Sequence, residues 1–274
     1  MFYRVAAKHT PENHRARHKR GTTNPLVSAL CDLGTVHSIH AADWPEPGGP
    51  VRLNFFADDA PQGAMNEMLG ATLNVDEYLL RLHVELDRVD RAEMRRMADL
   101  IYGAWEQEKF VYIFGNGGSG TTATHMSEDL GKSTLRECDL ADEAKKRLKV
   151  MSLTDNLGWI MAVGNDLAYD QIFVQQLMNY GTPGDVVVAI SGSGNSGNVL
   201  AAVDWANRHG LKTFGLTGFN GGKLRTMAQA GLHVPLDDMG MVESIHLALF
   251  HFVLNDVFAR INHVGRYAAE KAPA

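Results

Sequence analysis

The sequence predicts an α/β fold with a doubly wound parallel sheet, and two observations support this prediction. From residue 75 onward, short apolar runs rich in β-branched or aromatic residues alternate with longer segments of helical periodicity, which is the pattern of βαβ units. Two of the runs, 110–114 and 185–190, are each followed by a glycine- and serine-containing loop and then by a helix. Runs of this kind are typical of buried parallel strands. We therefore expect a five-stranded sheet flanked by helices.

The expected elements follow one another along the chain. Apolar residues recur at helical spacing from Val75 to Gln107, which predicts one or two long N-terminal amphipathic helices. Strands are then expected at 110–114, near Val150, and at 185–190, 212–216 and 232–235. Helices are expected from Ser119, around 157–179, over 196–209, from Gly222 and from about Val242.

The first 65 residues differ in composition from the rest of the chain. They contain six prolines and five histidines and show no sustained periodicity. This composition predicts a poorly ordered N-terminal extension over residues 1–65 and a single domain over residues 66–274. Residues 51–56 suggest one short strand within the extension.

Composition excludes several classes of protein. With 45% hydrophobic residues, the 274-residue chain can form a substantial core. A net charge of −6 argues against nucleic acid as the main partner, and we interpret the basic run at 14–20 as a solvated tail. Two cysteines without CxxC spacing indicate a reducing compartment. Because there is no apolar leader and no run of eighteen apolar residues, we expect a cytoplasmic protein that does not bind a membrane.

The two Gly/Ser loops, at 115–119 and 191–196, predict a cradle for a phosphate group. Glycines let the backbone approach an anion, serine hydroxyls and main-chain N–H groups donate to its oxygens, and a following helix adds a positive partial charge. Neither loop matches GxxxxGK[ST] or GxGxxG, so a phosphorylated small molecule is favoured over a nucleotide. Two ordinary βα turns are the alternative.

Several motifs together resemble a known family. They are GNGGS at 115–119 with a histidine and acidic residues after it, VGND at 163–166, ISGSGNSGNV at 190–199, LTGFNGGKL at 216–224 and ESIHLALFH at 243–251. In this order they resemble the sugar isomerase (SIS) fold, and within it the phosphoheptose isomerases, over residues 75–263. The resemblance implies an SIS-type sheet and a cytoplasmic homotetramer with active sites between subunits. It also implies zinc binding and conversion of sedoheptulose 7-phosphate to D-glycero-D-manno-heptose 7-phosphate for lipopolysaccharide heptose biosynthesis.

Four residues suggest a site for zinc or another divalent cation. His125 and Asp129 are four residues apart and share one face of a helix. Glu243 and His251 are eight apart, about 80° around the helix axis, and could also converge. Two imidazoles and two carboxylates suit such a cation. Solvated surface residues are the alternative, but all four positions match those of the metal site in the family.

Isomerisation between an aldose and a ketose requires a base, an acid and stabilisation of an enediolate. We assign Asp129 as the base and His251 as the acid, with a bound cation polarising the substrate oxygens. Asn165 and Asp166 match family positions that contact sugar hydroxyls, although a turn is the alternative interpretation. His246 is interpreted as structural. The expected substrate-binding residues are Asn116, Gly117, Gly118, Ser119, Asn165, Asp166, Ser191, Gly192, Ser193, Ser196 and Glu243.

The chain departs from the family pattern at a few positions. Asp129 replaces a glutamate, which shortens the reach of the carboxylate by about 1.5 Å. Glu243 replaces a glutamine, and the additional charge should tighten the binding of a divalent cation. Gly192 replaces a threonine and removes one hydroxyl donor. An arginine expected after the acidic residue is not evident, and Lys132 could replace its charge but not its bidentate geometry.

Two further functions remain open at this point. A non-catalytic protein resembling the DnaA initiator-associating protein would share the scaffold, and residues 154–156 resemble such proteins. Those proteins lack the acidic residue and the histidine that this chain has as Asp129 and His251, which favours the enzyme. A phosphosugar-sensing or amino-sugar-processing SIS module is the other alternative.

Overall fold

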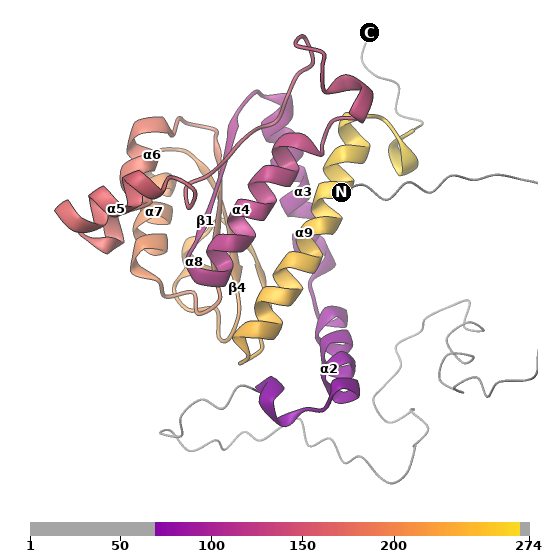
Figure 1. Ribbon diagram of the computed structural model, residues 1–274, viewed down its shortest axis with the longest axis vertical. Helices are drawn as coiled ribbons and strands as arrows, with labels where there is room; N and C mark the ends of the chain where they lie inside the picture. The colour runs from indigo at the N-terminus through magenta and orange to yellow at the C-terminus, as the bar shows by residue number, and fades with distance from the viewer. Residues whose placement is uncertain (1–68, 269–274) are drawn as a thin grey trace, which may run out of the picture. The chain divides into compact units, whose positions relative to one another are not determined.

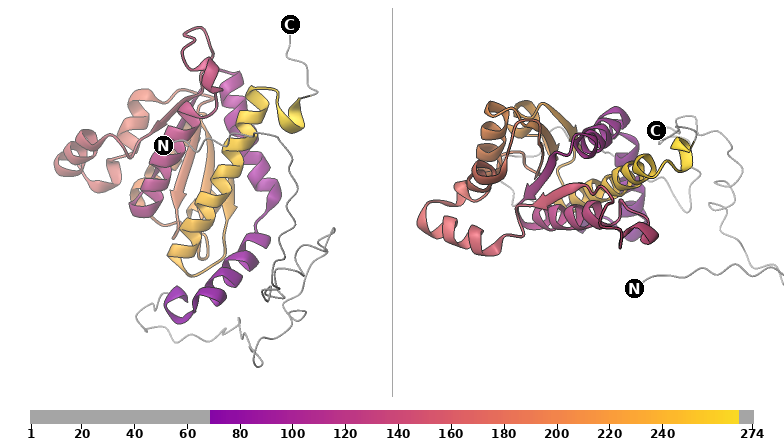
Figure 2. Two further views of the ribbon diagram at one scale, coloured as in Figure 1. Left: turned by 45° about the vertical axis from the view of Figure 1, so that its right-hand side comes forward. Right: turned by 90° about the horizontal axis from the view of Figure 1, so that it is seen from above.

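The computed structural model describes residues 69–268, drawn in colour in Figure 1. The proposed extension at 1–65 and the short strand at 51–56 lie outside the described residues. The described part folds around one five-stranded sheet with helices on both faces (Figures 1 and 2). The predicted α/β class and doubly wound sheet are therefore confirmed.

All strand pairs in the sheet are parallel, and the strand order is β2-β1-β3-β4-β5. The strands are β1 (Phe110–Gly115), β2 (Lys149–Ser152), β3 (Val186–Ser191), β4 (Lys212–Thr217) and β5 (Ala230–His233). β5 begins two residues earlier than the apolar pattern indicated, because Ala230 pairs with Phe214 of β4. Pro235, at the expected end of the strand, has no N–H to donate to a ladder.

Alternate residues of the strands build two separate cores, as the period of two in a strand requires. Val111 and Ile113 of β1 face one core, whereas Tyr112 and Phe114 face the other. The first core packs against helices α3 (Arg91–Glu106), α4 (Gly117–Lys132) and α9 (Met239–Ile261), and the second packs against α6 (Val174–Tyr180), α7 (Gly197–Arg208) and α8 (Leu224–Met227). Both faces of the central strands are therefore apolar, which explains why these strands are continuous apolar runs in the sequence.

The N-terminal helical pattern forms two helices, α2 (Val75–Asp87) and α3 (Arg91–Glu106). Asn74 caps α2 and forms a capping box with Glu77, which satisfies two backbone donors at once. Asp90 caps α3 by accepting from two backbone N–H groups. This cap stops one helix from running into the other.

The remaining helices connect the strands. They are α4 (Gly117–Lys132), α5 (Leu157–Asp166), α6 (Val174–Tyr180), α7 (Gly197–Arg208), α8 (Leu224–Met227) and α9 (Met239–Ile261), with short 3₁₀ turns η2 (Leu69–Thr72), η3 (Glu137–Asp139), η4 (Tyr169–Gln171) and η5 (Gly265–Tyr267). α4 and α9 lie side by side on one face of the sheet and run in the same direction (Figure 1). α5 stands out from the edge of the domain and contains no buried residue.

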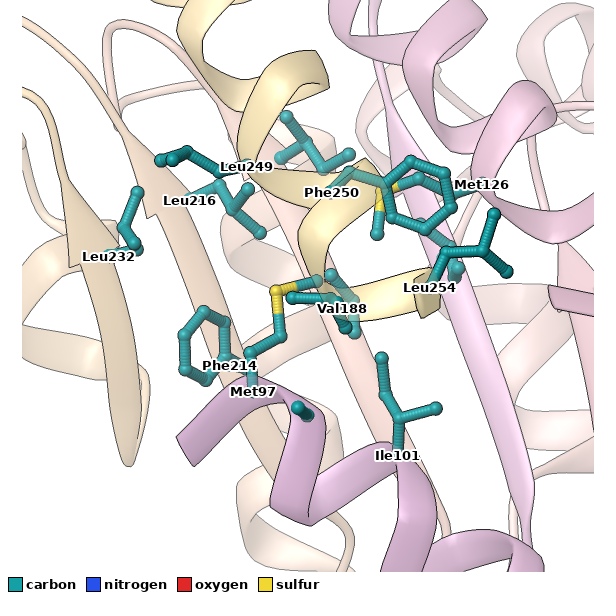
Figure 3. Close-up of a cluster of buried hydrophobic side chains, with 14 of the residues drawn as sticks. Met97, Ile101, Met126, Val188, Phe214, Leu216, Leu232, Leu249, Phe250 and Leu254 are labelled. Atoms are coloured by element: carbon teal, nitrogen blue, oxygen red, sulfur yellow. The ribbon is translucent and has the colours of Figure 1, made fainter. Parts of the chain in front are cut away.

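α9 is the central helix of the larger core. Leu249, Phe250 and Leu254 of this helix lie in one buried cluster with Met126 of α4 and Met97 of α3 (Figure 3). Among the described residues, the segment Met239–Tyr267 is long and apolar enough to cross a membrane by length and composition. Half of the most apolar 18-residue stretch of this segment is buried in the domain, so packing in the core accounts for part of its apolar character.

Candidate active site

The two Gly/Ser loops lie next to each other at the carboxyl edge of the sheet. Strands β1 and β3, which precede them, are hydrogen-bonded neighbours, and Gly115 is in register with Ile190. The strand order reverses between these two strands, and ligands of such sheets bind at this switch point. We call residues 115–119 and 191–196 together the cradle.

A side-chain network ties the two loops of the cradle together. The amide of Asn116 donates to Asn198 Oδ1 at 2.9 Å, and the amide of Asn198 donates back to Asn116 Oδ1 at 2.8 Å. The hydroxyl of Tyr169, in η4, donates to the same Asn116 oxygen at 3.0 Å. Asn116 therefore holds the start of α4 against the start of α7. The sequence analysis did not predict Asn198 or Tyr169 as site residues. Asn198 could have been found, because it is a polar residue at the start of a predicted helix within a Gly/Ser motif.

The second loop is fixed mainly by its own backbone. The N–H of Gly194 donates to the carbonyl of Ser191 at 2.9 Å, and the hydroxyls of Ser191 and Ser196 share a hydrogen bond of 3.1 Å. Gly194 has φ +66°, and a Cβ there would overlap the backbone of Gly221 in the loop after β4. Glycine is therefore required for a conformation and a close approach at this position. Ser193 is exposed, whereas Ser191 is buried at the strand end.

His125, Asp129 and His251 form the second part of the site, and we call them the trio. Their candidate ligand atoms all lie within 4.8 Å of one another. Asp129 Oδ2 lies 3.3 Å from His125 Nε2 and 3.9 Å from His251 Nε2, and the two imidazole rings cross at 73° with centroids 5.2 Å apart. The side chains of the two histidines are about half-exposed, at 44% and 45%. The trio thus opens to the surface of the domain.

This donor set fits a divalent cation. Two imidazoles and one carboxylate are a usual protein ligand set for catalytic zinc, which keeps a further position for water or substrate. The nearby Lys132 does not take the place of the missing arginine, because its ammonium pairs with Glu128. The hydrogen bond from Lys132 holds the pKa of the Glu128 carboxyl below its usual value.

Glu243 does not join the other three residues as expected. Its carboxylate lies against Gly118 at the start of α4, where an added Cβ would overlap it. The angular count placed Glu243 and His251 on one side of α9 but omitted the rise along the helix, which is about 12 Å for eight residues. The expected four-residue metal site is therefore corrected to the trio, with Glu243 at the cradle. An acidic group is favourable at a helix N-terminus.

Asn165 and Asp166 end α5, and both are exposed. The amide of Asn165 donates to the Asp166 carboxylate at 2.8 Å. Among the described residues, neither side chain forms a hydrogen bond or ion pair with the cradle. Tyr169, three residues further on, makes that connection instead.

His246 is a structural residue, as expected. It is 1% exposed, and its Nε2 donates to the carbonyl of Thr217 at 3.3 Å. Burial lowers the pKa of His246 to about 4, because the charged form loses its hydration. His246 is therefore neutral at pH 7 and lies on α9 between Glu243 and His251.

Residues of the β2–α5 connection also support the first loop. The methyl group of Thr154 lies 3.0 Å from where a Cβ of Gly120 would be, and its hydroxyl is 3.4 Å from the carbonyl oxygen of Gly115. The hydroxyl of Thr124 donates to the carboxylate of Asp155. These contacts pack α4 against the next segment, and sequence spacing carried no signal for them.

Comparison with known proteins identifies the family of this chain. The SIS domain family matches residues 77–218, which is more than half of the chain. The chain belongs to the SIS domain family. This SIS protein is 38% identical over 143 residues to the phosphoheptose isomerase of Rhodospirillum rubrum, covering 52% of this chain and 72% of that protein. It is 36% identical to the probable phosphoheptose isomerase of Thermoplasma acidophilum, covering 57% of this chain and 82% of that protein.

Solved structures give the same result. The phosphoheptose isomerase of Francisella tularensis superposes on this SIS protein with a TM-score of 0.60 at 26% identity, covering 67% of this chain and 95% of that chain. The phosphoheptose isomerase of Neisseria gonorrhoeae gives a TM-score of 0.58 at 28% identity, covering 65% of this chain and 91% of that chain. The SIS protein described here is therefore an isomerase.

Proposed function

We propose that this SIS isomerase converts sedoheptulose 7-phosphate to D-glycero-D-manno-heptose 7-phosphate in the cytoplasm, as a step of lipopolysaccharide heptose synthesis. The observation that carries the proposal is that both functional parts are built on helix α4, each completed by one further helix. The cradle lies at the starts of α4 and α7, and the trio lies further along α4 and α9. One part suits a phosphate and the other suits proton transfer.

The cradle holds the phosphorylated end of the substrate. Hydroxyls of Ser193 and Ser196 and backbone N–H groups of the second loop donate to phosphate oxygens, and the start of α7 adds a positive partial charge. The first loop takes the sugar hydroxyls. Glu243 of α9, whose carboxylate lies against the start of α4, accepts from hydroxyl groups and repels a second phosphate-like anion from this loop.

Asp129 is the base and His251 is the acid. The Asp129 carboxylate takes a proton from C1 of the ketose while His251 donates a proton to O2, which yields the enediol. Asp129 then returns its proton to C2, and His251 takes the proton from O1, which gives the aldose and restores both groups. The residues that would hold zinc are His125, Asp129 and His251, and a bound zinc ion supplies polarisation of the substrate oxygens.

The spacing of the two parts supports an oligomer with a shared site. Ser119 and Asp129 are ten residues apart on α4, about 15 Å along the helix. A seven-carbon phosphate is about 10 Å long when extended, at about 1.3 Å of chain per carbon–carbon bond. We therefore infer that the trio of one copy acts on a substrate held in the cradle of a second copy, within a homotetramer. The half-exposed histidines leave the trio accessible to that copy.

Incubation with sedoheptulose 7-phosphate tests the reaction. We expect aldose formation that a chelator abolishes and added zinc restores. Asp129→Ala and His251→Ala variants should lose it. If the parent protein does not convert this substrate with zinc present, the proposed reaction is wrong.

Mixing two inactive variants tests the shared site. Asp129→Ala lacks the base, and Ser196→Ala weakens the cradle. If each site takes its two parts from different copies, random reassembly of the two variants restores about a quarter of the sites. Activity that stays at the level of the separate variants after reassembly would contradict the shared site.

A further inference from the structure

The first turn of α9 covers the cradle through contacts with its glycines. A Cβ atom added to Gly192 in the second loop would overlap the Sδ atom of Met239 and lie 2.9 Å from its Cε atom. On the first loop, Glu243 lies against Gly118 in the same way. One helical turn therefore contacts both loops of the cradle at positions that have no side chain of their own.

A third contact of the same turn shows what is particular about Met239. A Cβ on Gly218, in the loop after β4, would lie 2.7 Å from either γ-carbon of Val242. Val242 is completely buried, so this contact is core packing. Met239 is 40% exposed. Met239 therefore covers Gly192 and yet remains partly exposed.

The position of Gly192 places this thioether beside a hydroxyl donor. Gly192 lies between Ser191 and Ser193, and its carbonyl accepts from the N–H of Gly218 at 2.8 Å. Ser191 is buried and its hydroxyl bonds to that of Ser196, whereas Ser193 is exposed. The second loop thus offers the Ser193 hydroxyl next to an apolar side chain.

We propose that Met239 is a specificity-determining residue that packs against the carbon chain of a sugar phosphate beside its phosphate group. A thioether accepts hydrogen bonds weakly and adapts its shape to an apolar neighbour. C–H groups of a ligand gain from this contact, whereas a hydroxyl pressed against the sulfur loses water without a replacement partner. The proposal rests on the proposed function, because it takes the cradle to hold a sugar phosphate.

Gly192 is the matched partner of Met239 in this arrangement. A methyl group at position 192 needs the space of the sulfur, and a methionine side chain can rotate away at small cost. Gly192→Ala should therefore displace the thioether, whereas Met239→Ala removes it. Both variants should give the same binding defect, and the double variant should add nothing further, as expected for residues that act through one contact.

Calorimetric titration with two ligands tests the proposal. Inorganic phosphate has no carbon chain, whereas sedoheptulose 7-phosphate has one. In Met239→Ala, Gly192→Ala and the double variant, we expect the Kd for sedoheptulose 7-phosphate to rise about fivefold, the size of a partial apolar contact. The Kd for inorganic phosphate should stay within twofold. Met178→Ala, a half-exposed methionine on α6, is the matched control and should change neither Kd.

Three results would overturn the role of Met239. They are an unchanged Kd for the sugar phosphate in Met239→Ala, an equal loss of affinity for both ligands, and additive losses in the double variant. If Gly192→Ala fails to fold, Met239→Ala alone still decides between the first two. A parent protein that binds sedoheptulose 7-phosphate without turnover fails as an isomerase of this sugar, yet the comparison of Kd values still applies. A parent that binds neither ligand also overturns the proposal.

Discussion

The cradle and the trio lie at different levels along helix α4, and they are held in place by different means. The cradle consists of loops whose strands pair directly, with buried serines and a reciprocal bond between Asn116 and Asn198. The trio consists of side chains on exposed helix faces that meet around one carboxylate, that of Asp129. Backbone position defines the first, and side-chain position defines the second. The cradle is therefore preformed for binding, whereas the trio depends on a single group.

Replacing Asp129 should impair the trio most strongly and leave the cradle unaffected. We expect Asp129→Asn to lower kcat by about a thousandfold, since positioned acid–base groups contribute factors of this order. The KM should change little, because the cradle is intact. Steady-state kinetics with sedoheptulose 7-phosphate measures both values. Glu128→Gln, which removes the neighbouring exposed carboxylate, is the control, and a kcat for Asp129→Asn within tenfold of the parent would rule out Asp129 as the base.

Low pH should destabilise the whole domain, and with it both the cradle and the trio, because the buried His246 resists protonation in the folded state. The folded pKa of about 4 lies below the unfolded value of 6.5, so the unfolded state binds the proton more readily between these values. The contribution of His246 to stability is present above pH 6.5 and is lost as pH falls toward 4, on the order of 3 kcal/mol. Thermal unfolding between pH 7 and 4.5 measures it.

The histidine variants test that assignment. His246→Gln should flatten the acid side of the stability profile, because the group that must become charged is absent. His83→Gln is the control, since His83 is exposed on α2. A profile for His246→Gln that parallels that of the parent would mean that other groups, such as His233, cause the acid loss.

Replacing Asn198 should weaken the cradle by a smaller amount and leave the trio intact. Asn198→Ala removes the partner of Asn116 and leaves a partly buried amide unsatisfied, which costs about 1–2 kcal/mol. We expect the KM for the sugar phosphate to rise about tenfold, with zinc affinity unchanged. Asn179→Ala, at an exposed position on α6, is the control. An equal loss of zinc affinity in Asn198→Ala would show that the two parts are not independent.

The smallest effect is expected at Glu243. Its carboxylate contacts Gly118 of the cradle and is not grouped with His125 and His251. Glu243→Gln removes a negative charge from the start of α4 and should tighten phosphate binding about threefold, in line with helix-terminus charge effects. The Kd for zinc should stay within twofold, because the trio does not include Glu243. Calorimetry with each ligand measures both. A clear loss of zinc affinity would restore Glu243 as a metal ligand.

The parts of the site differ in how far the sequence predicted them. The loops were predictable because glycine, serine and a preceding apolar run are adjacent in the chain. The contact between His125 and Asp129 followed from their spacing of four on one helix. The place of Glu243 did not follow, because an angle around α9 says nothing about which neighbouring helix lies at each level. Tyr169 and Met239 carried no signal, since their contacts join segments far apart in sequence.

Local patterns along the chain were enough to predict the strand-and-helix order, the Gly/Ser loops and the pairing of His125 with Asp129. These features depend on local propensity and on distances within one element, which helix and strand geometry set. The folded domain was needed to establish that β1 adjoins β3, that α9 brings His251 to Asp129 and Met239 to Gly192, and that Glu243 lies at Gly118. These relations depend on the strand order and on the packing of α4 beside α9, which many long-range apolar contacts fix together.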